Sequence, residues 1–316
     1  MARRGRAPGT GREASALTAA SESIQPLSEA LAAGWQEGWI KRPQGPLRYA
    51  TAGTGIPLVL CHGFIGSAEN FESWVPRLSR HRQLVIPDLP GFGGSAPLPG
   101  AHTSRALAAE VLALLDQLQL RRYELGGLCL GAAVALEILA MAPDRAQRMI
   151  LHTPLLAPGS VARTFRLQAR LATAPGVFEL ISFLGRRRVL ADLYRRVAVE
   201  GNAEVDRRAA DLNFANQVRA DPRAAREWLR DGMAADFRAL LDAWKGPVAV
   251  LVAGDDRLLE LDRVAEYCSR RPRTEISVIP SAGHGWDAEL IRRQLDVLES
   301  FLAEAESVPH PAAAAS

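Results

Sequence analysis

Apolar and polar residues follow two recurring patterns along this chain. Short runs of consecutive apolar residues are separated by longer stretches in which apolar residues recur every three or four positions. The short runs predict strands buried on both faces of a sheet, and the longer stretches predict amphipathic helices. The predicted strands are an opening pair between 35 and 51, then 56–61, 83–87, 123–128, 148–152, 247–253 and 275–279.

The same periodicity predicts helices between these strands. They lie at 70–80, 103–118, 130–142, 261–271 and 287–304. Strands that alternate with helices imply a mostly parallel sheet with helices on both faces. The predicted fold class is therefore α/β.

The alternation is interrupted once, between residues 155 and 245. This segment contains helical patterns only, with breaks at Pro175-Gly176, Gly201-Asn202 and Asp221-Pro222. We interpret it as an all-helical lid inserted after the sixth strand. The predicted organisation is a core in two parts (26–154 and 246–306), the lid (155–245) and disordered tails at 1–25 and 307–316.

Composition and charge change this picture little. The chain is 48% hydrophobic and 23% charged, which is ordinary for a soluble globular protein. Residues 1–12 carry four arginines and no acidic residue, so the remainder has a net charge of −1 and gives no argument for nucleic-acid binding. Three cysteines are too few for a disulfide framework, and no apolar run approaches a membrane span. We expect a cytoplasmic protein without nucleic-acid partners, and the oligomeric state stays open.

Candidate chemistry appears where the strand at 123–128 meets the helix at 130–142. Gly127, Cys129 and Gly131 form a Gly-x-Cys-x-Gly motif there. A sharp strand-to-helix turn holds its central residue in a strained conformation, and glycines on either side leave room for the close approach of strand and helix. The helix N-terminus would favour a thiolate. Alone, the motif also fits a small buried side chain in a Gly-rich turn.

Four further motifs each follow a predicted strand. They are His62-Gly63-Phe64, Asp88-x-x-Gly91-x-Gly93-x-Ser95, Gly254-Asp255-Asp256-Arg257 and His284. Together with the cysteine motif they resemble the α/β-hydrolase superfamily over about residues 47–303, with cysteine where serine is the usual nucleophile. The resemblance implies the α/β-hydrolase fold and covalent acyl transfer.

The resemblance also implies a role for each residue. Cys129 would be the nucleophile, His284 the general base, and Asp256 the acid that orients the histidine. The sequence departs slightly from the family pattern here, because the family commonly places the acid three positions after the strand-ending glycine, whereas Asp256 is two after Gly254. Alignment on the Asp256-Arg257 pair favours Asp256, and Asp255 is the rival acid.

Four other residues are predicted to complete the site. Backbone N–H groups of Phe64 and Leu130 would form the oxyanion hole. Phe178 and Phe183 belong to an apolar block of the lid and are predicted to bind substrate, although such a block also fits simple packing. No cofactor is expected, and the scattered His and Cys residues lack the spacing of a metal site.

Cysteine in this position favours thioesters and activated esters, because the acyl-enzyme is itself a thioester. We expect hydrolysis of an ester or thioester. An acyltransferase or polyester-synthase-like enzyme is one alternative, and a non-catalytic ligand-binding member of the fold is another. Residues 155–196 carry eight arginines against two acidic residues. This charge suits an acyl group presented on coenzyme A or an acyl carrier protein, but a solvated helix face is the commoner reason for such a charge.

Overall fold

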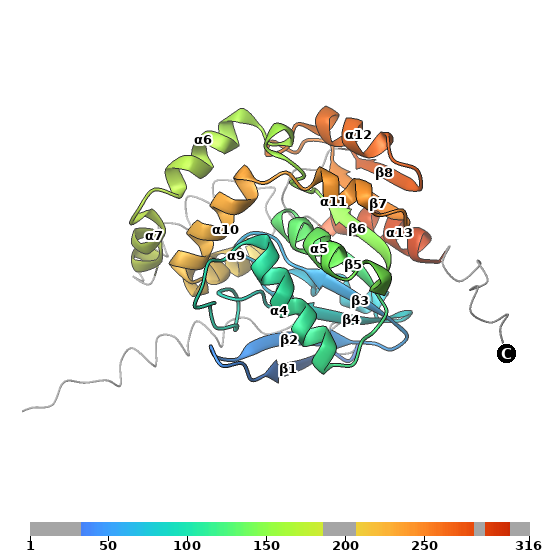
Figure 1. The fold of residues 1–316 in the computed structure, drawn as a ribbon, viewed down its shortest axis with the longest axis horizontal. Helices are drawn as coiled ribbons and strands as arrows, with labels where there is room; N and C mark the ends of the chain where they lie inside the picture. Colours follow the sequence, from blue (N-terminus) through green and yellow to red (C-terminus); the bar gives the residue numbers. More distant parts are fainter. Residues whose placement is uncertain (1–32, 186–206, 281–287, 304–316) are drawn as a thin grey trace, which may run out of the picture.

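The computed structural model describes residues 33–185, 207–280 and 288–303, so both predicted tails lie outside the described residues. Eight strands form a single sheet, shown in Figure 1. They are β1 (Gln36–Ile40), β2 (Leu47–Ala52), β3 (Ile56–Cys61), β4 (Arg82–Pro87), β5 (Tyr123–Leu128), β6 (Ala146–His152), β7 (Val248–Ala253) and β8 (Thr274–Ile279).

The sheet is mostly parallel, as the alternating sequence pattern predicts. Its strand order is β1-β2-β4-β3-β5-β6-β7-β8. β2 pairs antiparallel with both β1 and β4, and all the remaining neighbours pair in parallel. In a parallel sheet the carboxyl ends of the strands meet at one edge, so the loops after β3, β5 and β7 are brought together there.

Two hydrophobic cores lie on opposite faces of the sheet. In β3, Val59 and Cys61 face the core formed with α4 (Ser104–Gln117) and α5 (Leu130–Met141). The alternate residues Leu58 and Leu60 face the core formed with α3 (Val75–Leu78) and α13 (Ala288–Ala303). Burial on both faces explains why β3 is a continuous apolar run.

One predicted helix differs from the structure. Residues 70–80 form a 3₁₀ turn, η1 (Ala68–Phe71), followed by the separate short helix α3. Pro76 lies in the first turn of α3 and has no N–H to donate to a helix that began earlier. The apolar residues Phe71, Trp74 and Leu78 still reach the core, which is why their helical spacing misled the prediction.

All the named elements in the described part of the segment between β6 and β7 are helices. Its elements are η3 (Pro158–Ser160), α6 (Arg163–Ala172), α7 (Val177–Gly185), α9 (Arg207–Arg219), α10 (Pro222–Ala234) and α11 (Arg238–Ala243). In Figure 1, α6, α7, α9 and α10 lie side by side, and contacts link α10 to α6, α7, α4 and α5. This helical insertion follows the sixth strand, and its action as a lid stays a prediction.

α10 packs against the core helices α4 and α5. Trp228 is fully buried, and its indole N–H donates to Ser104 of α4 over 3.2 Å. A Cβ at Gly232 would overlap the side chain of Leu130, the first residue of α5. α10 therefore packs directly beside the β5–α5 turn. Outside the insertion, α12 (Leu261–Ser269) connects β7 to β8.

Candidate active site

Cys129 occupies a strained turn between β5 and α5. Its φ of 51° and ψ of −116° are uncommon for an L residue, and such strain is typical of functional turns. The turn is closed by hydrogen bonds from Cys129 N to the His152 carbonyl (2.9 Å) and from Ala132 N to the Cys129 carbonyl (3.2 Å). Cys129 remains partly exposed while its neighbours Leu128 and Leu130 are buried.

The two glycines of the motif are required by close backbone approach. A Cβ at Gly127 would overlap the carbonyl oxygen of Gly131, across the turn itself. A Cβ at Gly131 would overlap the carbonyl oxygens of Cys61 and His62, at the end of the neighbouring strand. The start of α5 therefore lies directly against the end of β3.

The loop that follows β3 runs beside Cys129. A Cβ at Gly63 would lie 3.3 Å from the Cβ of Cys129, which places the backbone of this loop next to the thiol-bearing residue. Phe64 is the next residue along the loop, and Leu130 is the first residue of α5. N–H groups in the first turn of a helix have no acceptor within that helix. Of the two predicted oxyanion-hole residues, Leu130 therefore follows Cys129 in the chain, and Phe64 follows Gly63, whose backbone lies beside Cys129.

His62 supports this loop from within the core. Its Nε2 accepts a hydrogen bond from the Leu89 N–H (2.9 Å), so Nδ1 carries the proton and donates to the Gly63 carbonyl (2.9 Å). Complete burial lowers the pKa of His62 to about 4. The ring is therefore neutral and fully engaged, which agrees with the sequence interpretation that His62 shapes the turn.

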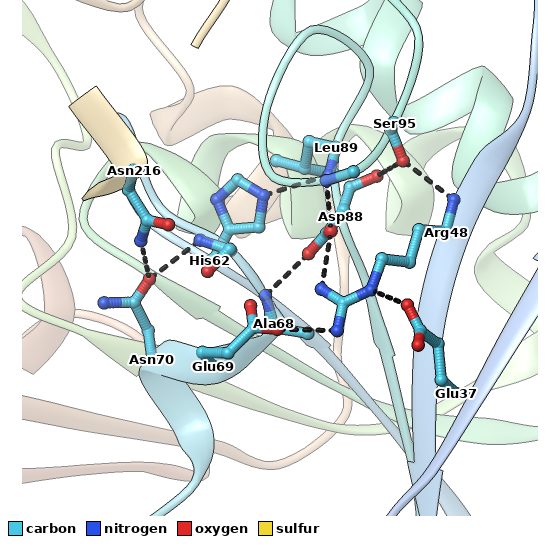
Figure 2. A network of polar contacts seen from close by, with 12 residues as sticks. Glu37, Arg48, His62, Ala68, Glu69, Asn70, Asp88, Leu89, Ser95 and Asn216 are labelled. Carbon is cyan, nitrogen blue, oxygen red and sulfur yellow. Dashed lines mark hydrogen bonds and ion pairs between the residues drawn. The ribbon is translucent and has the colours of Figure 1, made fainter. Parts of the chain in front are cut away.

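A buried charged network lies beneath the same loop (Figure 2). Arg48 of β2 binds Asp88 (2.9 Å) and Glu69 (2.6 Å). Asp88 also accepts the N–H groups of Ala68 and Gly94, both over 2.7 Å. Burial alone would raise the pKa of Glu69, but the hydrogen bond and charge of Arg48 outweigh it and hold that pKa below its usual range.

The network joins the loop after β3 to the loop after β4. Its Asp88 belongs to the Asp-x-x-Gly motif found in the sequence, whereas Arg48 and Glu69 carried no sequence signal. At its edge, Asn216 of α9 donates to Asn70 of η1 (3.3 Å), so the helical insertion is also tied to this loop (Figure 2). The motif at Asp88 therefore holds the predicted oxyanion loop in place.

The two aspartates after β7 lie in different surroundings. Asp256 is 7% exposed, and its Oδ1 accepts the N–H of Leu258 over 2.8 Å. Asp255 is exposed. The loop that carries both is fixed to the start of the insertion by hydrogen bonds from Ala162 N to the Leu258 carbonyl and from Glu260 N to the Ser160 carbonyl, both 2.9 Å. His284, the predicted base, lies outside the described residues.

The two phenylalanines predicted to bind substrate are separated. Phe178 is 6% exposed, and its ring packs edge-on against Phe64 with 6.0 Å between centroids. Phe183 lies on the same helix, α7, but is 55% exposed. The structure therefore brings Phe178 into contact with the loop beside Cys129, and the role of Phe183 in substrate binding stays a prediction.

Two absences hold for the part of the chain that the structure describes. No group of three or more His, Cys, Asp or Glu side chains there could hold a metal ion. None of the helices in that part is long and apolar enough to cross a membrane.

Known proteins resemble this chain over most of its length. It is 29% identical over 259 residues to the dihydrolipoyllysine-residue acetyltransferase component of the acetoin cleaving system of Pseudomonas putida, covering 78% of this chain but only 64% of that protein. It is 25% identical over 269 residues to a 2-hydroxymuconate semialdehyde hydrolase of a Pseudomonas species, covering 81% of this chain and 90% of that protein.

Solved structures share the fold. A bromoperoxidase from Bacillus anthracis superposes with a TM-score of 0.71 at 19% identity, covering 85% of this chain and all of that one. Residues 56–285 match the family model of the alpha/beta hydrolase fold, and this span includes the sheet from β3 onward, the Cys129 turn and the insertion. The chain therefore belongs to the alpha/beta-hydrolase fold family.

Proposed function

We propose that this protein hydrolyses an ester or thioester through an acyl-cysteine intermediate on Cys129. The observation that carries the proposal is the conformation of Cys129, with φ 51° at the start of α5. Such a conformation costs on the order of 1–3 kcal/mol, and it persists where the surrounding structure holds a functional group in place. A protein that only bound ligands would need neither the strain nor a partly exposed thiol.

The reaction has two steps. The Cys129 thiolate attacks the acyl carbonyl carbon, a C–S bond forms, and the bond to the leaving alcohol or thiol breaks. His284 takes the thiol proton and passes it to the leaving group. Water, deprotonated by the same histidine, then attacks the new thioester and releases the acid and the free thiol. The N–H groups of Phe64 and Leu130 would stabilise the oxyanion of both steps.

Asp256 is the better candidate for the acid of the triad. A carboxylate that orients a catalytic histidine has to be held in one position and shielded from water. Asp256 is buried and accepts a backbone hydrogen bond, whereas Asp255 is exposed. Phe178 is likewise the better candidate of the two phenylalanines for contact with the acyl group, because it touches Phe64.

Acyl transfer to an alcohol, amine or thiol is a second candidate function. The relative named as an acetyltransferase component matches 78% of this chain. An acyl-cysteine is a thioester, so transfer of its acyl group to another thiol is close to thermoneutral and transfer to oxygen or nitrogen is downhill. The two functions differ only in the acceptor that reaches the acyl-enzyme. Acyl groups carried on coenzyme A or an acyl carrier protein belong to both proposals.

Mass spectrometry of the intact protein tests the proposal. The protein is incubated with a panel of acyl thioesters and activated esters, the reaction is quenched in acid, and the intact mass of the protein is measured. We expect a mass increase equal to one acyl group for the preferred substrate, absent in Cys129→Ala and retained in the matched variant Cys268→Ala. An adduct that survives in Cys129→Ala would refute the covalent role of this residue. Adding alcohols, amines or thiols and analysing the released product separates hydrolysis from transfer.

A further inference from the structure

A cleft of about 400 Å³ opens where the helical insertion meets α12. Four of its six lining residues are charged. The lining consists of Gly159, Val161, Arg163, Arg166, Glu260 and Arg263. Neither Cys129 nor Phe64 belongs to it, so the cleft is distinct from the candidate active site.

Backbone pairing fixes the two walls of the cleft to each other. Val161, just before α6, forms an antiparallel bridge with Leu259, just before α12. On either side of this bridge, Ala162 N donates to the Leu258 carbonyl and Glu260 N donates to the Ser160 carbonyl. The cleft is therefore a built feature of the fold rather than a gap between two independent loops.

The arginines of the cleft have almost no counter-charge. The side chains of Arg163 and Arg166 make no hydrogen bond or ion pair with any residue in the described ranges 33–185, 207–280 and 288–303. Within the same ranges the side chain of Arg263 has one charged partner, Glu266, at 3.8 Å. Against these three cations the lining contains one carboxylate, Glu260. Guanidinium groups gathered in this way repel one another, and an anion bound between them would relieve that repulsion.

We propose that this cleft binds a phosphate group attached to a larger molecule. Arg163 and Arg166 lie one turn apart on α6, and therefore on the same face of that helix, while Arg263 approaches from α12. Guanidinium groups bind phosphate oxygens through paired, charge-assisted hydrogen bonds. The positive end of the α12 dipole adds to the field at Glu260 and Leu261. The cleft is larger than a single phosphate, which leaves space for the molecule that bears it.

The phosphate has two possible sources. One is a soluble phosphorylated carrier of the coenzyme A type, and the other is a phospholipid headgroup. Leu167 and Leu171 on the same helix are 59% and 65% exposed, which suits contact with a lipid surface beside the cleft. The inference requires no chemistry at Cys129, so it stands or falls separately from the proposed function.

Titration calorimetry of the full chain tests the cleft, with adenosine 3′,5′-bisphosphate and inorganic pyrophosphate as soluble probes. We expect saturable binding that weakens about tenfold or more in Arg166→Gln and in Arg163→Gln, because each loses a charge-assisted pair of hydrogen bonds. Arg170→Gln is the matched control. It removes the same charge from the same helix, is exposed, and does not line the cleft. It should leave the dissociation constant within about twofold.

Glu260→Gln provides a test in the opposite direction. Removing the one carboxylate of the lining should tighten binding by a few-fold, and a variant that merely damaged the fold would not do so. In a parallel arm, co-sedimentation with phosphatidylcholine vesicles with and without phosphatidylglycerol tests the lipid source. Binding to the anionic vesicles alone, with the same dependence on Arg166, assigns the site to a headgroup. The inference is overturned if none of these probes binds, or if Arg170→Gln weakens binding as much as Arg166→Gln.

Discussion

β3 and β5 are neighbours in the sheet, and each leads to a cysteine at its carboxyl end. Cys61 is the last residue of β3 and pairs in register with Gly127 of β5. It is fully buried, and burial raises its pKa to about 12. Cys129 lies one residue beyond the end of β5, where the chain turns with positive φ into a helix and the side chain is partly exposed.

The difference lies in the backbone and not in the side chain. Cys61 lies within its strand, and its thiol is in the core. Cys129 lies one residue beyond its strand, and its thiol is at the N-terminus of α5. Cys268 in α12 resembles Cys61 in this respect, because burial raises its pKa to about 11. A cysteine near a strand end is therefore no argument for a nucleophile by itself, and the proposal for Cys129 depends on its strained strand-to-helix turn.

Removing the thiol of the turn should have the largest effect. Cys129→Ala is expected to lower kcat/KM for the preferred acyl substrate by about 10⁴-fold or more, because the covalent route is lost. Cys268→Ala should keep activity within a few-fold. Steady-state kinetics and a melting curve for each variant check both statements. Full activity in Cys129→Ala would remove the distinction between the two kinds of cysteine.

The two aspartates after β7 also differ in burial, because Asp256 is buried and Asp255 is exposed. Asp256→Asn should reduce kcat by about 10³–10⁴-fold, because an amide no longer stabilises the histidine tautomer and its positive charge. Asp255→Asn conserves size in the same loop and should change kcat less than about twofold. The opposite ranking of the two variants in the same assay would make Asp255 the acid.

Phe178 and Phe183 offer a similar pair on α7. Phe178→Ala removes a buried ring in contact with Phe64, so it should destabilise the fold by about 3–5 kcal/mol and alter the preference for acyl-chain length. Phe183→Ala removes an exposed ring and should change stability by less than about 0.5 kcal/mol. Urea denaturation and a series of acyl chain lengths measure the two effects. Equal changes in chain-length preference would support both phenylalanines as substrate-binding residues.

The close contact between the β5–α5 turn and the end of β3 is tested by Gly131→Ala. The added methyl group would overlap the carbonyl oxygens of Cys61 and His62, and we expect a loss of about 1–3 kcal/mol in the free energy of unfolding. Gly100→Ala is the matched control, because its Cβ would meet no atom within 4 Å. A Gly131→Ala protein as stable as the wild type would show that the turn can move away from β3.

The sequence predicted the sheet and the position of the cysteine turn, because apolar runs and glycine spacing are local signals. It missed the break at Pro76, since the apolar residues on both sides of the break keep helical spacing. It could not show that Arg48 supports the loop after β3, because Arg48 is distant from Glu69 and Asp88 in the sequence and contacts them only in the folded chain. The sequence also could not show that Asp256 is buried and Asp255 exposed, since loop residues have no periodic pattern that distinguishes buried from exposed positions.

Competitive labelling of the three cysteines tests the central claim most directly. The folded protein is treated with limiting iodoacetamide at pH 8, and peptide mapping gives a rate for each thiol. Because a thiol with a pKa of about 12 is ionised to only about one part in 10⁴ at this pH, Cys61 should react slowly, and Cys129 should react at least about 100-fold faster. Prior incubation with a slowly hydrolysed acyl thioester should protect Cys129 alone. Comparable labelling of Cys61 or Cys268, or a Cys129 that the acyl thioester fails to protect, would contradict the assignment of Cys129 as the nucleophile.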